Sequence, residues 1–280
     1  MSSRRSSRRS LLAFFLLTFT LAIPCWLVGA KGDRLSAGLL SVLPSFLPVS
    51  ALQAVCPLLA ALILVGSQDR LDGMLAFLRR VVDPTTVRRK RWYLPAIVLL
   101  PIAMALSYWV MSLMGTLLPE PCIAFLSVPV LVALYFLAAV FEEGGWTGYA
   151  TDPLQSRWSP QTTSLMLGLV TAVFHVVPLL EVGSTLPWIV GWLAGTMAQR
   201  VLMVWLYNTT GRSVFAISVF HALVNVSESL LPNNGAPDPA VSGTVLSMMA
   251  ALVAFVWGPK TLARCGDAAR CSGFARGTVS

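Results

Sequence analysis

Long apolar runs alternate with short polar and basic segments along most of this chain. A helix needs about 20 mostly apolar residues to cross a bilayer, and this pattern repeatedly provides that length. It predicts an all-α, polytopic membrane protein with about eight transmembrane helices. The predicted spans are approximately 11–29, 38–66, 93–115, 122–143, 160–180, 186–207, 213–231 and 241–258.

The composition favours the same class of protein. Of the 280 residues, 56% are hydrophobic and only 11% are charged, whereas soluble domains average about 25% charged residues. We interpret residues 1–280 as a single integral-membrane domain with a disordered, Gly-, Ser- and Arg-rich tail over 259–280. The five cysteines are scattered and form no CxxC pair, so they predict neither a metal site nor a disulfide framework.

The net charge of +8 follows the predicted membrane topology. Basic residues cluster before the first span, between the second and third spans, and after the last span. With eight spans these segments lie on one side, which the positive-inside rule makes cytoplasmic. We therefore expect a multi-pass protein of the cell membrane with both termini in the cytoplasm, and no nucleic-acid partner. The loop 67–91 also contains a short amphipathic pattern, interpreted as a basic anchor at the lipid surface.

A few polar residues stand inside the apolar runs. The only two histidines, His175 and His221, lie in two predicted spans, and the pair Glu142–Glu143 ends a third. A charged side chain at the bilayer centre costs about 2.5–3.5 kcal/mol on insertion scales, so it is usually retained for a function. These residues, together with Asn225, predict an active site within the membrane.

The spacing of these polar residues suggests that they have different roles in the site. Adjacent residues on a helix point about 100° apart, so Glu142 and Glu143 cannot share a face. His221 and Asn225 are four residues apart and do share one, as a pair of donors to an oxyanion would. Each feature also has a structural alternative: a solvated pair at a helix end, a hydrogen-bonded core histidine, or an interhelical hydrogen bond.

Three motifs occur in a specific order. They are Glu-Glu-x-Gly-Trp-x-Gly-Tyr at 142–149, Phe-His-x-x-Pro at 174–178, and His-Ala-x-x-Asn at 221–225. In this order and spacing the chain resembles the CAAX-protease and bacteriocin-processing family of intramembrane glutamic endopeptidases, which are similar to type II CAAX prenyl endopeptidases. The resemblance covers about residues 135–228, the expected catalytic core.

The resemblance implies hydrolysis of a peptide bond by a glutamate-activated water. Glu142 matches the catalytic glutamate, and His175 matches the histidine that helps to hold the water. His221 and Asn225 match the pair that steadies the oxyanion, and Glu143 matches a supporting glutamate. The expected substrate is a peptide or a membrane-anchored protein, and no cofactor is expected.

The chain departs from the family pattern at one position. An arginine usually stands four residues after the supporting glutamate, but this chain has Thr147 there. Arg200, inside the sixth predicted span, is the candidate replacement and is expected to pair with Glu143 or Glu142. The alternative is that Arg200 extends to the inner membrane interface.

A zinc site is a further alternative, because two histidines and a glutamate can bind zinc with one open position. We favour a metal-free site because the chain has no His-Glu-x-x-His pair and Asn225 is a poor zinc ligand. The predicted depths also disagree, since Glu142 lies at the inner end of its span and His175 over ~20 Å deep. The residues meet only if the fourth span is broken after Glu143 or the fifth begins below the membrane surface.

Two other functions remain open at this stage. A transporter or proton pathway would use Glu142, His175 and Arg200 as a relay. A catalytically silent family member would act as a binding or immunity scaffold, and Thr147 keeps that alternative open. The lack of an internal repeat and the His221–Asn225 pair favour the endopeptidase.

Overall fold

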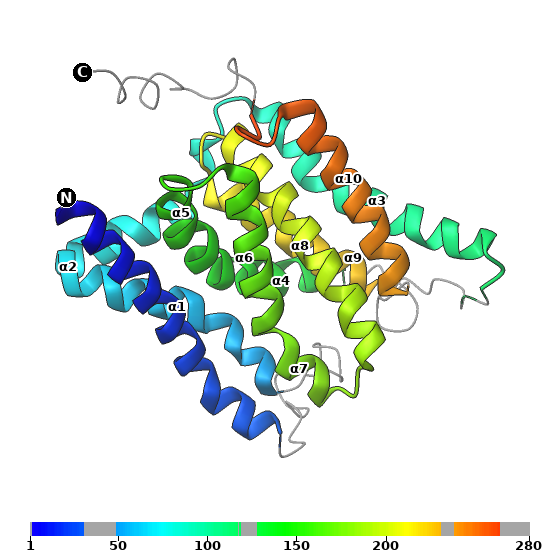
Figure 1. The fold of residues 1–280 in the computed structure, drawn as a ribbon, viewed down its shortest axis with the longest axis horizontal. Coiled ribbons are helices and arrows are strands. Elements are labelled where there is room, and N and C mark those ends of the chain that lie inside the picture. The colour runs from blue at the N-terminus through cyan, green and yellow to red at the C-terminus, as the bar shows by residue number, and fades with distance from the viewer. Residues whose placement is uncertain (1, 31–48, 117, 119–127, 231–237, 264–280) are drawn as a thin grey trace.

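A computed structural model describes residues 2–30, 49–116, 118, 128–230 and 238–263. Every regular element in this part of the chain is a helix, and the helices form one bundle (Figure 1). Seven helical segments are long and apolar enough to cross a membrane, and Val214–Ser229 is a shorter apolar helix. The predicted all-α, polytopic fold is confirmed, and the seventh predicted span, 213–231, corresponds to the shorter helix.

The helices follow one another without intervening strands in the described residues. The long helices are α1 (Ser2–Gly29), α2 (Cys56–Val81), α3 (Tyr93–Leu113), α4 (Val128–Glu143), α6 (Pro160–Phe174), α8 (Leu186–Thr209), α9 (Val214–Ser229) and α10 (Pro239–Trp257). The shorter elements are η1 (Val49–Val55), η2 (Pro84–Thr86), η3 (Lys90–Trp92), the π-helix η4 (Gly144–Thr151), α5 (Asp152–Gln155) and α7 (Val176–Glu181).

The start of α1 and the end of α10 lie toward the same end of the bundle, which we call the base (Figure 1). Ser10, near the start of α1, hydrogen-bonds Tyr149 of the π-helix. The backbone N–H of Gln161, at the start of α6, donates to the carbonyl of Pro259 over 3.3 Å. The base therefore brings together the segments that the charge pattern assigns to one side of the membrane. The compartment that this side faces stays a prediction.

The second predicted span, 38–66, is followed by a further helical segment instead of a loop. Its described part begins at Val49, and α2 continues to Val81, well beyond the predicted end at residue 66; residues 31–48 lie outside the described part. The backbone at Arg70 is non-helical, with φ 55° and ψ −153°, so a kink separates the apolar span from the segment 71–81. This segment carries the amphipathic pattern, with Leu71 exposed and Val81 fully buried.

The fourth span does not end or break at Glu143, contrary to expectation. The helix continues from α4 into the π-helix η4 and then α5, so that Val128–Gln155 forms one segment of spanning length. The glycines allow this segment to approach α2 closely. A Cβ at Gly145 would lie 2.5 Å from the carbonyl carbon and oxygen of Pro57. The absent side chain, rather than a helix break, explains why glycine is needed here.

We expect Gly145→Ala to destabilise the protein by about 1–3 kcal/mol, because the new methyl group overlaps the α2 backbone and the helices must separate. Gly148→Ala is the matched control, since a Cβ there would lie 3.4 Å from Phe77, an ordinary contact. Thermal unfolding in detergent compares the two variants. Equal melting temperatures would contradict the close packing of η4 against α2.

Part of the predicted disordered tail is ordered. The chain turns at Gly258, where φ is 78°, and returns across the base. The carbonyl of Thr261 accepts a hydrogen bond from Asn208 over 3.2 Å, and Leu262 is fully buried. The prediction of disorder is therefore wrong for residues 259–263, and residues 264–280 lie outside the described part.

Candidate active site

The unbroken fourth span places the paired glutamates near the middle of a helix. Glu142 lies about 20 Å from the end of the segment at Gln155, counted along the helix. His175 lies about 22 Å from the start of α6 at Pro160 on the same count. The depths of the two residues therefore agree. The π-helix accounts for this, because it extends the span toward the base by the length that the sequence interpretation left out.

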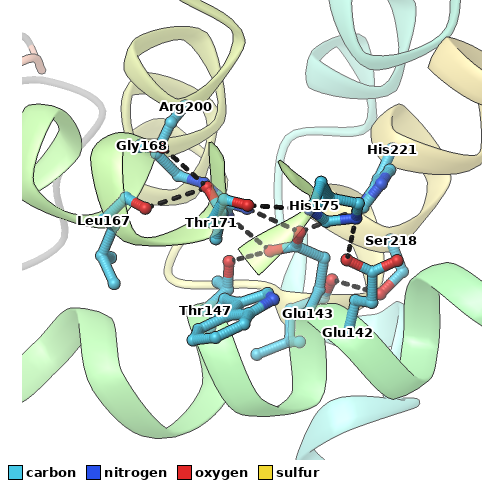
Figure 2. A network of polar contacts seen from close by, with 12 residues as sticks. Glu142, Glu143, Thr147, Leu167, Gly168, Thr171, His175, Arg200, Ser218 and His221 are labelled. Atoms are coloured by element: carbon cyan, nitrogen blue, oxygen red, sulfur yellow. Dashed lines mark hydrogen bonds and ion pairs between the residues drawn. The ribbon is translucent and has the colours of Figure 1, made fainter. Parts of the chain in front are cut away.

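Glu143 is the centre of a buried ion pair (Figure 2). Arg200 of α8 donates from Nη1 to Oε2 over 2.7 Å and from Nη2 to Oε1 over 3.1 Å. The Glu143 side chain is fully buried and that of Arg200 is 4% exposed, so this two-point contact is shielded from solvent. Thr147 also donates its hydroxyl to Oε2 of the same carboxylate. Arg200 thus pairs with Glu143 instead of extending to the membrane interface.

His221 of α9 contacts the same carboxylate. Its Nδ1 lies 2.9 Å from Oε1 of Glu143. An ionised carboxylate only accepts hydrogen bonds, so Nδ1 carries the hydrogen and donates it. The contact fixes the ring orientation and leaves Nε2 as the nitrogen free to meet another group.

Glu142 faces a different histidine (Figure 2). Its Oε2 lies 3.7 Å from Nε2 of His175, and the glutamate is 7% exposed. Nδ1 of His175 is 2.7 Å from the carbonyl of Thr171, which only accepts, so Nδ1 donates. In the neutral ring Nε2 is then an acceptor that faces an accepting carboxylate. The separation exceeds that of a direct hydrogen bond and suits a shared donor.

His175 is held where α6 gives way to α7. It ends α6 with φ −92° and ψ −4°, and its ring lies 5.5 Å from that of Trp192 on α8. The preceding residue, Phe174, is fully buried and packs edge-on against Trp146 of the π-helix, with ring centroids 5.4 Å apart. This aromatic packing fixes the helix junction that carries His175 relative to the helix that carries Glu142.

Asn225 is separate from this network. It is half-buried on α9, one turn beyond His221, and no hydrogen bond joins its side chain to the rest of the described chain. The structure thus forms two groups from the predicted residues: Glu142 with His175, and Glu143 with Arg200 and His221. Asn225 shares the helix face of His221 and is hydrogen-bonded to neither group.

The sequence analysis missed the contribution of Thr147. We treated this position as a loss, because a threonine cannot neutralise a carboxylate. In the structure Arg200 provides the charge and Thr147 provides a neutral hydrogen bond to the same oxygen atom. The four-residue spacing between Glu143 and Thr147 was a usable signal for this contact, because it places both on one face of a helix.

The described residues contain no group of three or more His, Cys, Asp or Glu side chains arranged to hold a metal ion. Glu143 and Nδ1 of His221 are bonded to each other, which leaves Glu142, His175 and the second nitrogen of His221 as potential ligands. The metal-free site stays a prediction.

The fold and the buried carboxylate–imidazole centre define a polytopic membrane protein with an enzyme-like site inside the helix bundle. Residues 123–227 match the family model described as type II CAAX prenyl endopeptidase Rce1-like. The chain is also 23% identical over 265 residues to CAAX prenyl protease 2 from Methanococcus maripaludis, with 86% of this chain and 92% of that protein covered. Both similarities are to CAAX prenyl proteases, and they support an endopeptidase activity in the membrane.

Proposed function

We propose that the protein hydrolyses a peptide bond with a water molecule activated by Glu142. The proposal depends on the 3.7 Å separation between Glu142 Oε2 and His175 Nε2. A water between these two acceptors donates one hydrogen to each, which leaves its lone pair free to attack a carbonyl carbon. Glu142 takes the proton as the new C–O bond forms, and passes it to the amine when the C–N bond breaks.

His221 and Asn225 are proposed to stabilise the oxyanion that forms in this step. The Nδ1–H of His221 is bonded to Glu143, so only Nε2 can face the substrate. To donate from Nε2 as well, the ring must carry a second proton. Asn225 adds a neutral donor one turn away, and two donors of this kind are typical of oxyanion sites.

Glu143 and Arg200 support the site in this proposal. Arg200 replaces the arginine that the family has at the position of Thr147, and it keeps Glu143 ionised and correctly oriented for His221. A compensated Glu143 weakens the alternative of a catalytically silent scaffold, which rested on Thr147. The pairing also weakens the alternative of a proton relay through Arg200, because both terminal nitrogens of its guanidinium are committed to one carboxylate.

The expected substrate is a peptide or a membrane-anchored protein. The direct test is cleavage of a membrane-anchored reporter peptide by the detergent-purified protein, with Glu142→Gln as the matched control. We expect product from the unmodified protein and almost none from the variant. Equal cleavage by both proteins would contradict the proposed role of Glu142.

Metal independence is a separate prediction. Since the proposed water is held by Glu142 and His175 alone, EDTA and phenanthroline should leave the rate of reporter cleavage unchanged. Loss of activity with either chelator, followed by recovery on addition of zinc, would favour the zinc alternative. Excess magnesium added together with EDTA controls for indirect effects of the chelator on the lipid or detergent.

The orientation in the membrane is also testable. Because the charge pattern assigns the basic segments to one side of the membrane, we expect both ends of the chain in the cytoplasm. Fusions of a compartment-sensitive reporter after residue 258 should be active only in the cytoplasm. The control is a fusion within the loop 182–185, between α7 and α8, which should give the opposite result. Activity outside the cell for the first fusion would contradict the predicted topology.

A further inference from the structure

A second polar cluster lies between the candidate active site and the base of the bundle, and is centred on Arg80. Arg80 belongs to the segment of α2 that follows the kink at Arg70. Its Nη2 lies 2.9 Å from Asp152 Oδ2 and 2.7 Å from the hydroxyl of Tyr207. Tyr207 in turn donates to Oδ1 of Asp152 over 3.1 Å. One guanidinium thus joins α2, α5 and α8.

Arg80 also donates a hydrogen bond to the backbone of the π-helix. Its Nη1 donates to the carbonyl of Gly148 over 3.2 Å. In a π-helix this carbonyl would accept from the N–H five residues later, but that residue is Pro153, which has no N–H. Arg80 therefore donates to a carbonyl whose partner position in the π-helical pattern is a proline.

The cluster joins the same two elements as the buried ion pair of the site. Glu143 and Asp152 lie on the continuous segment 128–155, and Arg200 and Tyr207 lie on α8. Tyr207 is seven residues beyond Arg200, which places both on one face of α8, two turns apart. Two cross-links, one at each level, define the distance and the rotation of α8 relative to the helix that carries the glutamates.

We propose that Arg80 is a positioning residue for the hydrolytic reaction. It holds the end of the π-helix against α8, and so keeps Glu142 aligned with His175 and Glu143 aligned with Arg200 and His221. The inference rests on the proposed function, since it assumes that these groups carry out the chemistry. Arg80 itself is about two turns of helix closer to the base than the carboxylates and does not touch the substrate.

The test compares Arg80→Met with Arg79→Met, measured as kcat and KM for the reporter peptide. Both side chains are exposed and both variants remove one positive charge from adjacent positions, but only Arg80 bonds Gly148, Asp152 and Tyr207. Small displacements of catalytic groups reduce turnover strongly, so we expect kcat to fall about tenfold or more for Arg80→Met with KM nearly unchanged. Arg79→Met should match the unmodified protein. Equal kcat for both variants would refute the proposal.

Pro153→Ala provides a second, independent test of the mechanism. Alanine restores an N–H five residues after Gly148, so in the Arg80→Met background it should recover part of the lost kcat. A merely electrostatic role of Arg80 toward Asp152 predicts no recovery, and that result would refute the backbone contact as the cause. Should Arg80→Met fail to fold, Tyr207→Phe removes the 2.7 Å contact and retains the ring, and must then show the reduced kcat.

Failure of this inference can be distinguished from failure of the proposed function. If Glu142→Gln is inactive and Arg80→Met has normal kcat, only the positioning role is wrong. If Glu142→Gln retains normal turnover, the proposed chemistry is wrong, and any fall in kcat for Arg80→Met needs another cause. Measuring all variants at equal folded fraction, by size exclusion and thermal unfolding, separates both outcomes from a loss of protein.

Discussion

Glu142→Gln should reduce turnover by ~10²–10⁴, the range typical of losing a general base, while leaving the protein folded. Glutamine preserves the size and hydrogen-bonding capacity of the side chain but cannot take a proton from water. Glu142 has no ion pair with an arginine or lysine in the described chain, and its 3.7 Å contact with His175 is longer than a direct hydrogen bond. Turnover of the reporter peptide and the melting temperature in detergent are the two measurements.

Two comparisons make the result specific. Asn225→Ala should cost roughly 10²–10³ in turnover, the usual effect of removing one oxyanion donor, again with the fold preserved. Glu143→Gln should instead lower the melting temperature, because it leaves the buried Arg200 without its counter-charge. If Glu143→Gln abolished turnover and Glu142→Gln were tolerated, the two carboxylates would have exchanged roles, and Glu143 would be the base.

Arg200→Ala should have the largest effect on stability, about 3–5 kcal/mol, because removing one partner of a buried pair leaves the other charge uncompensated. Glu143 is fully buried and would keep only the contacts with Thr147 and His221. The measurement is the free energy of unfolding in detergent, together with protein level in the membrane.

The matched control is Arg212→Ala. Arg212 also pairs with a carboxylate, Asp152 at 3.4 Å, but its side chain is 64% exposed, and such pairs contribute at most about 1 kcal/mol. A neutral replacement of both buried partners, Glu143→Gln with Arg200→Met, should recover much of the stability lost in Arg200→Ala. Equal effects of Arg200→Ala and Arg212→Ala would contradict the buried ion pair.

The sequence predicted the class of fold because long apolar runs can be accommodated only as spanning helices. The predicted helix ends were wrong where contacts between distant segments, rather than local hydropathy, determine where a helix stops. Asp69 and Arg70 follow the predicted second span, and the backbone is non-helical at Arg70, yet the helix resumes after this kink and α2 ends at Val81, next to Arg80 with its ion pair to Asp152. Hydropathy is a local average, whereas this boundary depends on partners 72 residues away.

The candidate site residues could be identified from the sequence because polar side chains are rare inside apolar runs. The sequence predicted less well which of these side chains pair with one another. Pairing of Glu143 with Arg200 was one of two open alternatives, and nothing local distinguished it from an arginine at the interface. The π-helix was not predicted at all, because its glycines are equally consistent with a break. Within it, Gly145 packs tightly against Pro57, a contact between distant segments that the local sequence does not show.

The location of the counter-charge on α8 affects how the protein is made. Arg200 follows Glu143 by 57 residues, so the ribosome delivers both glutamates to the translocon well before their cationic partner exists. A charged residue at mid-membrane costs about 2.5–3.5 kcal/mol, and the newly made helix has no counter-charge to offset this cost. The helix with the glutamates therefore reaches its final environment only when α8 arrives. Until then the buried carboxylate of Glu143 lacks the two-point contact with Arg200.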